Sequence, residues 1–327
     1  FKMMVGDMVN EKQKGLAYSI QSFLCNAGSL VGFLFPFIFT WIGISNIAPQ
    51  GVVPDSVIYS FYIGAAILIL CVIYTTVKVK EMPPAEYAEY HGITEEEKKE
   101  KINMVKLLVK APKAFWTVGL VQFFCWFAFM FMWTYTNGSV AANVFDAPTV
   151  ETVVNGANKV VLDTKSIQYQ NAADWVGVLF AVQAIGSVLW AVCIPMFKNR
   201  KLIYSLSLVL GGIGFISTYF VHNQYVLFIS FLLIGCAWAA MLALPFTILT
   251  NALSGGHMGT YLGLFNGTIC IPQIVAATLG GSILALFTPK GMLPPEINML
   301  VMAGVMLIIG AVCVYLIKET KGEQAKA

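Results

Sequence analysis

Charged residues are scarce in this chain. Asp, Glu, Lys and Arg make up 11% of its 327 residues, against about a quarter in soluble domains, and Arg200 is the only arginine. Hydrophobic residues make up 58%, and the mean hydropathy is +0.74. These values exclude an ordinary soluble protein and predict an all-α integral membrane protein. Because the sequence has no basic patch interleaved with aromatic residues, no nucleic-acid partner is expected.

Catalytic and metal-binding motifs are also missing from the sequence. His91, His222 and His257 are far apart, and there is no P-loop, nucleophile elbow or HExxH motif. All seven cysteines lie within apolar runs without a CxxC pair, so disulfides and zinc are not expected. The sequence therefore predicts neither an enzyme nor a bound metal or cofactor.

Long apolar runs, by contrast, are abundant. A helix crosses a bilayer with roughly 20 residues, and eight runs reach that length: 16–43, 58–79, 114–136, 174–197, 202–221, 225–250, 260–287 and 297–317. Residues 1–8 are typical of the end of a ninth span. No initiator Met and no signal-peptide pattern precede them, so we expect the chain to be a protein truncated at its N-terminus.

Positive charge is distributed unevenly between the two sides of these spans. Seventeen of the 20 basic residues fall in loops on one side, and only Lys159, Lys165 and Lys290 fall on the other. By the positive-inside rule the richer side is cytoplasmic. The sequence therefore predicts a multi-pass protein of the cytoplasmic (inner) membrane, embedded in the lipid bilayer, with both ends of this chain in the cytoplasm.

Residues 80–113 form the longest segment on the predicted cytoplasmic side. Pro83-Pro84 is followed by the charge run 95–101, and apolar residues then recur at helical spacing from Ile102 to Val109. This pattern predicts an amphipathic helix lying on the inner membrane surface. We interpret the segment as a linker between two helical bundles, and a regulatory binding site is the alternative.

The interiors of the spans offer amides and indoles instead of charges. An amide in hydrocarbon requires a partner, either a neighbouring helix or a ligand. Amides bind sugar hydroxyls, and aromatic rings cover the apolar face of a sugar, so the predicted substrate is neutral and rich in hydroxyl groups. Helix-to-helix contacts and core packing are the alternative for each residue. The candidate substrate-binding residues are Asn26, Gln122, Trp126, Gln183, Trp190, Trp238, Asn266 and Gln273.

Two polar turns, each followed by an amide-bearing apolar run, suggest a weak internal repeat. Aligning Gly15 with Gly259 places Asp7 over Asn251, as in transporters built from two related halves. Pro272 lies in the middle of a predicted span, where its ring and missing N–H should kink the helix. With Gly259 and Gly263 it forms the predicted hinge.

Four stretches carry a resemblance to a known family: Gly6-Asp7, Gln21-Ser22-Phe23 with Asn26, Val121-Gln122-Phe123 with Trp126-Phe127-Ala128, and Gly259, Gly263 and Asn266 with Ile271-Pro272-Gln273-Ile274. In this order they resemble the glycoside–pentoside–hexuronide cation symporters. Within that family they look most like the branch of sucrose and maltose proton symporters, in the major facilitator superfamily. The similarity extends over essentially the whole chain.

The resemblance implies a fold of twelve helices, of which this chain holds helices 4–12. Residues 1–79 would be the remainder of an N-terminal six-helix bundle, 80–113 the cytoplasmic linker, and 114–327 a C-terminal six-helix bundle. Asp7 matches the acid at the end of helix 4 that is implicated in proton coupling. A residue that locks the closed gate is the alternative for Asp7.

The leading hypothesis is a secondary active transporter with alternating access. It would import a neutral sugar, a disaccharide such as maltose or sucrose, with a proton as the coupling ion, sodium being the other candidate, and it would act as a monomer. One alternative is a major facilitator efflux carrier of amphipathic compounds, which the aromatic span 114–136 favours. The other is a membrane sugar sensor that does not transport, since a fold alone does not fix a function.

Overall fold

The computed structural model describes residues 9, 13–44, 53, 55–80, 83, 86, 104–154, 157–253 and 258–317. Asp7, the predicted partial span 1–8 and the charge run 95–101 lie outside these residues, and so does one half of the suggested repeat. The described elements run along the chain as α2 (Lys14–Trp41), α3 (Asp55–Lys78), α6 (Met104–Lys110), α7 (Lys113–Asn143), β1 (Thr149–Val154), β2 (Ala157–Leu162), α8 (Ile167–Cys193), η1 (Ile194–Met196), α9 (Arg200–Ser217), α10 (Leu227–Ala252), α11 (Met258–Phe265), α12 (Gly267–Phe287), α13 (Ile297–Cys313) and η2 (Val314–Leu316).

The long helices coincide with the predicted spans. Within the described residues, seven helical segments are long and apolar enough to cross a membrane: 55–78, 113–143, 167–196, 200–217, 227–252, 259–287 and 297–316. The 28-residue α2 covers the remaining predicted span, 16–43. The prediction of an all-α membrane protein is confirmed. Helix α6 also forms within the stretch where an amphipathic surface helix was predicted.

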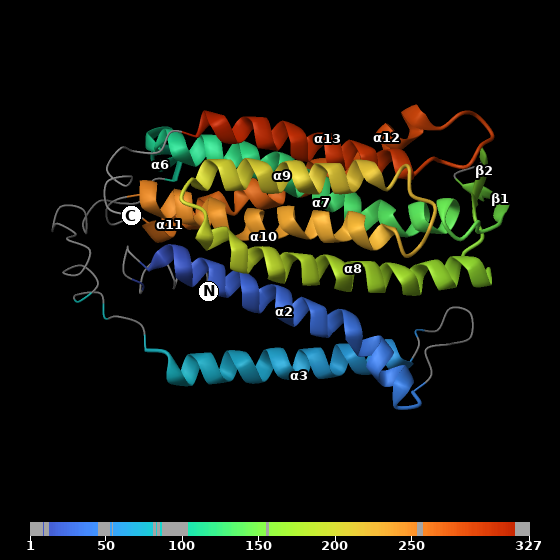
Figure 1. Ribbon diagram of the computed structural model, residues 1–327, viewed down its shortest axis with the longest axis horizontal. Coiled ribbons are helices and arrows are strands. Elements are labelled where there is room, and N and C mark those ends of the chain that lie inside the picture. The colour runs from blue at the N-terminus through green and yellow to red at the C-terminus, as the bar shows by residue number, and fades with distance from the viewer. Residues whose placement is uncertain are drawn as a thin grey trace.

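Helices α7 to α13 pack against one another, and α2 lies against α8 and α10 (Figure 1). Glycines allow the closest approaches. A Cβ on Gly235 of α10 would stand 2.7 Å from the Ser187 backbone nitrogen of α8, and a Cβ on Gly304 of α13 would stand 2.7 Å from the Gly212 carbonyl oxygen of α9. Such small-residue contacts are typical of membrane helices, where packing replaces the hydrophobic effect. Helix α3 packs on the opposite side of α2 and is exposed over almost its whole length.

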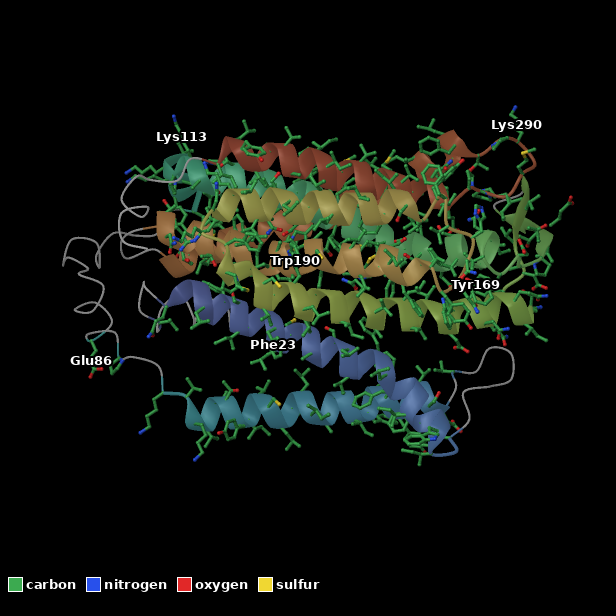
Figure 2. All side chains as sticks on the ribbon, viewed as in Figure 1. Phe23, Glu86, Lys113, Tyr169, Trp190 and Lys290 are labelled. Carbon is green, nitrogen blue, oxygen red and sulfur yellow. The ribbon has the colours of Figure 1, made fainter. Side chains whose placement is uncertain are left out.

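Successive long spans alternate in direction, with α11 and α12 forming one span, so the bundle has two distinct ends (Figure 1). Figure 2 shows Lys113, at the start of α7, and Lys290, between α12 and α13, at opposite ends. We call the Lys113 end, which is the predicted cytoplasmic side, the inner end, and the Lys290 end the outer end. Two of the loops end in side-chain caps, where Ser166 accepts from the Tyr169 N–H and Asn199 accepts from the Leu202 N–H.

The stretch 137–173, between the predicted spans 114–136 and 174–197, consists mostly of ordered secondary structure. Helix α7 continues to Asn143, seven residues beyond the predicted span, and α8 begins at Ile167 instead of near residue 174. Between them β1 and β2 form an antiparallel hairpin in which Thr149 pairs with Leu162 and Glu151 with Val160. The predicted spans 114–136 and 174–197 were therefore too short at these ends, and the α7 extension buries Gly138, Ser139 and Ala141 inside the bundle.

The predicted span 260–287 is interrupted, but not at its proline. Helix α12 is continuous through Pro272, whereas the break between α11 and α12 falls at Asn266. At the break the Ile269 N–H donates to the Asn266 carbonyl oxygen. The Phe265 carbonyl oxygen, four residues before Ile269, accepts from the Thr268 hydroxyl at 2.7 Å. The kink expected at Pro272 stays a prediction, since Pro272 lies within α12 and Asn266, at the break, keeps helical backbone angles.

Candidate functional site

Three tryptophans from two helices meet in the middle of the bundle. Trp126 and Trp133 lie two turns apart on α7, and Trp238 of α10 packs edge-on against both, with ring centroids 5.7 Å away in each case. The Trp126 and Trp133 centroids are 6.4 Å apart. Phe129, which is fully buried, lies 4.8 Å from Trp238 and supports the group from the bundle side. We call Trp126, Trp133 and Trp238 the indole cluster.

The indole cluster lies at mid-membrane depth. At 1.5 Å per residue, Trp126 is roughly 20 Å from the start of α7, and Trp238 is roughly 17 Å from the start of α10. Trp126 and Trp238 are half-buried, whereas Trp133 is 43% exposed. The cluster therefore presents aromatic surface near the centre of the membrane. Trp133 was not among the predicted site residues, although its spacing of seven from Trp126 was a signal that could have found it.

Gln122 connects α7 to α10 and has a clear structural task. Its side-chain amide Nε2 donates to the Met241 carbonyl oxygen at 2.9 Å. In a regular helix that carbonyl would accept from the N–H four residues later, but residue 245 is a proline inside α10 and has no N–H. Gln122 therefore replaces the donor that Pro245 lacks. A contact between helices, the alternative to substrate binding, thus explains the side-chain NH2 group of Gln122.

The side-chain oxygen of Gln122 and the indole N–H of Trp126 have no hydrogen-bond partner among the described residues. Gln122 Oε1 and the indole nitrogen Trp126 Nε1 are both buried and have no hydrogen-bond partner, and the two residues lie one turn apart on α7. Gln122 is 1% exposed. A buried polar atom without a partner costs about 1–3 kcal/mol. Gln122 Oε1 and Trp126 Nε1 are therefore an unpartnered acceptor and an unpartnered donor, enclosed among the helices beside the indole cluster.

Helix α2 turns a polar stripe toward α8 and α10. Tyr18, Ser22 and Asn26 follow one another at helical spacing and are buried, and α8 and α10 are the principal neighbours of α2. Asn26 Nδ2 donates to the Ser22 carbonyl oxygen at 2.7 Å, whereas Asn26 Oδ1 is buried without a partner. A third open polar atom therefore lies on the face where α2 meets the other helices.

The two candidates on α8 differ in how they are engaged. The Trp190 indole N–H donates to the Ser207 hydroxyl of α9 at 2.8 Å, so its polar group is used inside the bundle. Gln183 is buried, and its backbone lies against Gly235 of α10 at the closest approach of the two helices. Among the described residues, no hydrogen bond or ring contact joins either side chain to the indole cluster.

Asn266 and Gln273 lie on the interrupted helix α11–α12. Asn266 is exposed at the break and Gln273 is half-buried. Helix α12 packs on α7, where the Thr268 methyl group would stand 3.0 Å from a Cβ on Gly119. Gly259 and Gly263 have open space where a Cβ would be, so this helix is loosely held on that side. Asn266 keeps helical backbone angles, so its amide is exposed at a tightened turn within one nearly continuous span.

An aromatic layer, which the sequence reasoning missed, closes the inner end. Tyr18 of α2 packs on Phe246 of α10 at 6.1 Å, Phe246 on Phe265 of α11 at 5.7 Å, and Phe265 on Phe115 of α7 at 5.6 Å. All four rings are buried. Tyr261, which also packs on Phe115, donates from its hydroxyl to the Leu107 carbonyl oxygen of α6. The inner aromatic layer thus joins α2 to the helices that carry the indole cluster.

Other features of the described residues do not add to the site. No group of His, Cys, Asp and Glu within the described ranges could hold a metal ion, and the seven cysteines are free thiols. A cavity of about 10 Å³ lies at the outer end, lined by residues that include Ser139, Thr218 and Ile297. That volume fits a single water molecule, so the cavity is too small for a substrate.

The fold and the site together define a class of protein. A bundle of long apolar helices, with close glycine contacts and unpartnered buried polar atoms at mid-depth, is typical of a multi-pass membrane transporter. The sequence matches the family model of the Major Facilitator Superfamily over residues 2–158 and 141–327. The chain belongs to this superfamily. A comparison with curated proteins found no match.

Proposed function

We propose that the protein imports a neutral sugar, a disaccharide such as maltose or sucrose, by proton symport across the cytoplasmic membrane, with both ends of this chain in the cytoplasm. The sugar would bind between the predicted bundles 1–79 and 114–327. The observation that carries the proposal is the open donor and acceptor beside the indole cluster. The resemblance to the glycoside–pentoside–hexuronide symporters points to the same substrate class.

The chemistry of the indole cluster suits a sugar better than an ion. A pyranose has an apolar C–H face, which the indole rings would cover, and a rim of hydroxyl groups that each donate and accept a hydrogen bond. The hydroxyl groups would complete Gln122 Oε1 and Trp126 Nε1. The described spans bring no Lys, Arg or acid to the indole cluster, so a phosphate or carboxylate would find no counter-charge there.

Alternating access would require the inner aromatic layer to open. The contact of Tyr18 with Phe246 joins α2 to α10 at the inner end, and inward release of a substrate would require this contact to break. Separation of α2 from α10 and α11, with bending at Asn266 and at the glycines of α11, would open that path. Gly259, Gly263 and Pro272 remain the proposed hinge, and Asp7 the proposed coupling or gating residue.

The proposal is tested by uptake into liposomes that contain the purified protein. We expect labelled maltose or sucrose to accumulate when the lumen is made alkaline, and a protonophore to abolish the accumulation. Replacing the proton gradient by a sodium gradient distinguishes the two coupling ions. Failure to accumulate any of a dozen neutral sugars under either gradient would refute the proposed import.

Two tryptophan variants locate the site. Trp126→Phe keeps an aromatic ring but removes the open donor, and it should lower the apparent affinity about tenfold, the value of one hydrogen bond. Trp116→Phe is the matched control, because Trp116 lies on the same helix, is 55% exposed and packs on Phe115 away from the indole cluster. Equal effects of the two variants would place the sugar elsewhere.

Efflux of amphipathic compounds is the second candidate, and the density of aromatic rings on α7 and α10 favours it. Export of a fluorescent amphipathic dye that persists in Gln122→Ala and Asn266→Ala would support efflux over sugar import. A sensor that does not transport would bind a sugar, measured by equilibrium dialysis, without moving it into the liposomes.

A further inference from the structure

Glu296 is a carboxyl group enclosed at the outer end of the helices. It is the residue that precedes α13, and its carboxyl group lies directly against Gly138 of α7, in the space that a Cβ on Gly138 would fill. The absence of a side chain at Gly138 therefore leaves room for the Glu296 carboxyl group. The neighbours Ser139 and Ile297 line the cavity that fits one water molecule.

The surroundings of Glu296 offer it little to balance a negative charge. Tyr135, one turn before Gly138, is the titratable side chain of α7 that faces it, and the Tyr135 hydroxyl lies against Gly280 of α12. The other titratable side chains of α7, α12 and α13 are Lys113 at the inner end and Cys125, Cys270 and Cys313 at other depths. Lys290, in the preceding loop, is exposed at the outer edge (Figure 2). Among the described residues Glu296 forms no ion pair.

The enclosure favours the protonated form of the carboxyl group. Burial raises the pKa of Glu296 from its ordinary value of 4.5 to about 7. The position before α13 acts in the opposite direction, because a helix N-terminus stabilises a negative charge. Desolvation dominates, so the group exchanges its proton near neutral pH. An acid that titrates near neutrality on the outer side is suited to sensing a pH gradient across the membrane.

We propose that Glu296 is a proton-binding site that couples external pH to substrate binding. A proton from the outer solution adds to one carboxylate oxygen, giving a neutral carboxyl group that stays against Gly138, and no other bond forms or breaks. The ionised carboxylate moves toward water and loosens the contact between α13 and α7. Because α7 also carries Trp126 and Trp133, this movement reaches the indole cluster.

The coupling rests on the proposed function, whereas the proton site itself does not. The first measurement therefore needs no sugar: the carboxyl band of the full protein in liposomes is followed by infrared spectroscopy as a function of pH. We expect a band that titrates near pH 7 in the wild type and is absent in Glu296→Gln. A wild-type spectrum without such a band would overturn the proton site.

A second variant keeps the acid and removes its enclosure. Gly138→Ala places a methyl group where the carboxyl group lies, so the carboxylate should move into water and titrate near its ordinary value. Gly281→Ala on α12, where a Cβ meets open space, is the matched glycine control. Glu151→Gln in β1, an exposed outer carboxylate, is the control for loss of an acid. Band positions unchanged by Gly138→Ala would contradict the enclosure, even if Glu296→Gln fails to fold.

The coupling is measured as the affinity for maltose and sucrose between pH 5.5 and 8.5. We expect the affinity of the wild type to fall by as much as tenfold per pH unit above neutrality, and that of Glu296→Gln to remain at the acid value throughout. A variant that binds sugar with the pH dependence of the wild type would overturn the coupling while leaving sugar transport intact. A wild type that binds neither sugar would instead refute the proposed function, and the infrared titration would still decide the proton site.

Discussion

Gln122 gives the sharpest test of whether a membrane amide is structural, functional or both. Gln122→Leu removes the donor to the Met241 carbonyl oxygen, which Pro245 leaves without its usual partner. An unsatisfied buried carbonyl costs about 1–3 kcal/mol, and hydrogen bonds between membrane helices are worth about 0.6 to 1.7 kcal/mol. Removal of the unpaired Gln122 Oε1 offsets part of this loss. We expect the free energy of unfolding to fall by about 1–2 kcal/mol.

Pro245→Ala should rescue this loss, since alanine returns the backbone N–H to Met241. Gln122→Leu should then cost less in the background of Pro245→Ala than in the wild type, and the double-mutant cycle should give a coupling of about 1 kcal/mol. The assay is reversible unfolding in mixed micelles, followed by helical circular dichroism. Additive effects of the two substitutions would refute the reasoning, because they would show that Gln122 and Pro245 do not share the carbonyl.

The same double variant separates stability from function. If Gln122 Oε1 also accepts from the sugar, the double variant will be as stable as Pro245→Ala alone and will still bind maltose and sucrose weakly. Binding that recovers together with stability would mean that the amide acts only between the helices.

Three further predictions concern stability and gating. The free energy of unfolding of the wild type should fall as pH rises from 4.5 to about 7, because the folded state holds the Glu296 proton to a higher pH than the unfolded chain does. Glu296→Gln removes this loss of stability. Thermal unfolding should show the variant to be more stable than the wild type by up to about 3 kcal/mol at pH 8, with little difference below pH 4.5. Gly235→Ala should lower the free energy of unfolding by about 1–3 kcal/mol, because its Cβ would overlap α8, whereas Gly281→Ala should change it by less than about 0.5 kcal/mol. Phe246→Ala should weaken the inner aromatic layer, so iodide enclosed in the liposomes should quench tryptophan fluorescence more strongly than in the wild type; unchanged quenching would mean that the layer is not a barrier.

The spans could be predicted from the sequence because a helix that crosses the hydrocarbon core of the bilayer must be long and apolar. Runs of apolar residues, with lysines between them, place the helices within a few residues of their observed bounds, except where tertiary packing adds to them. The outer part of α7 contains Asn137-Gly138-Ser139, which is typical of a turn. It stays helical because Gly138 accommodates Glu296 and the Ser139 hydroxyl donates to the Tyr135 carbonyl oxygen. Neither contact is visible from local sequence.

The residue types of the candidate site could be predicted from the sequence, but the contacts that these residues make could not. Trp126, Trp238 and Gln122 were identified as candidates, and the structure brings them together on α7 and α10. Trp190 was chosen for the same reason, yet its N–H is used by Ser207, because periodicity does not tell which neighbour a face meets. The Gln122 contact with Met241 could have been anticipated, since a proline inside a membrane helix leaves one carbonyl that needs a donor.

The break at Asn266 shows a similar limit. The sequence marked Pro272 as the irregular point of this span, whereas the break between α11 and α12 falls at Asn266, which keeps helical backbone angles, and Pro272 is buried within α12. The kink at Pro272 stays a prediction. The roles of Asp7 and of residues 1–79 as one bundle stay predictions.

The most direct test of the central claim is the fluorescence of the indole cluster itself. The chain has seven tryptophans, and a variant in which the four outside the cluster are replaced by phenylalanine reports on Trp126, Trp133 and Trp238 alone. We expect a saturable change in this fluorescence on addition of maltose or sucrose, with a midpoint equal to the half-saturation of uptake. Uptake that continues while the fluorescence of the cluster stays unchanged at every sugar concentration would contradict it.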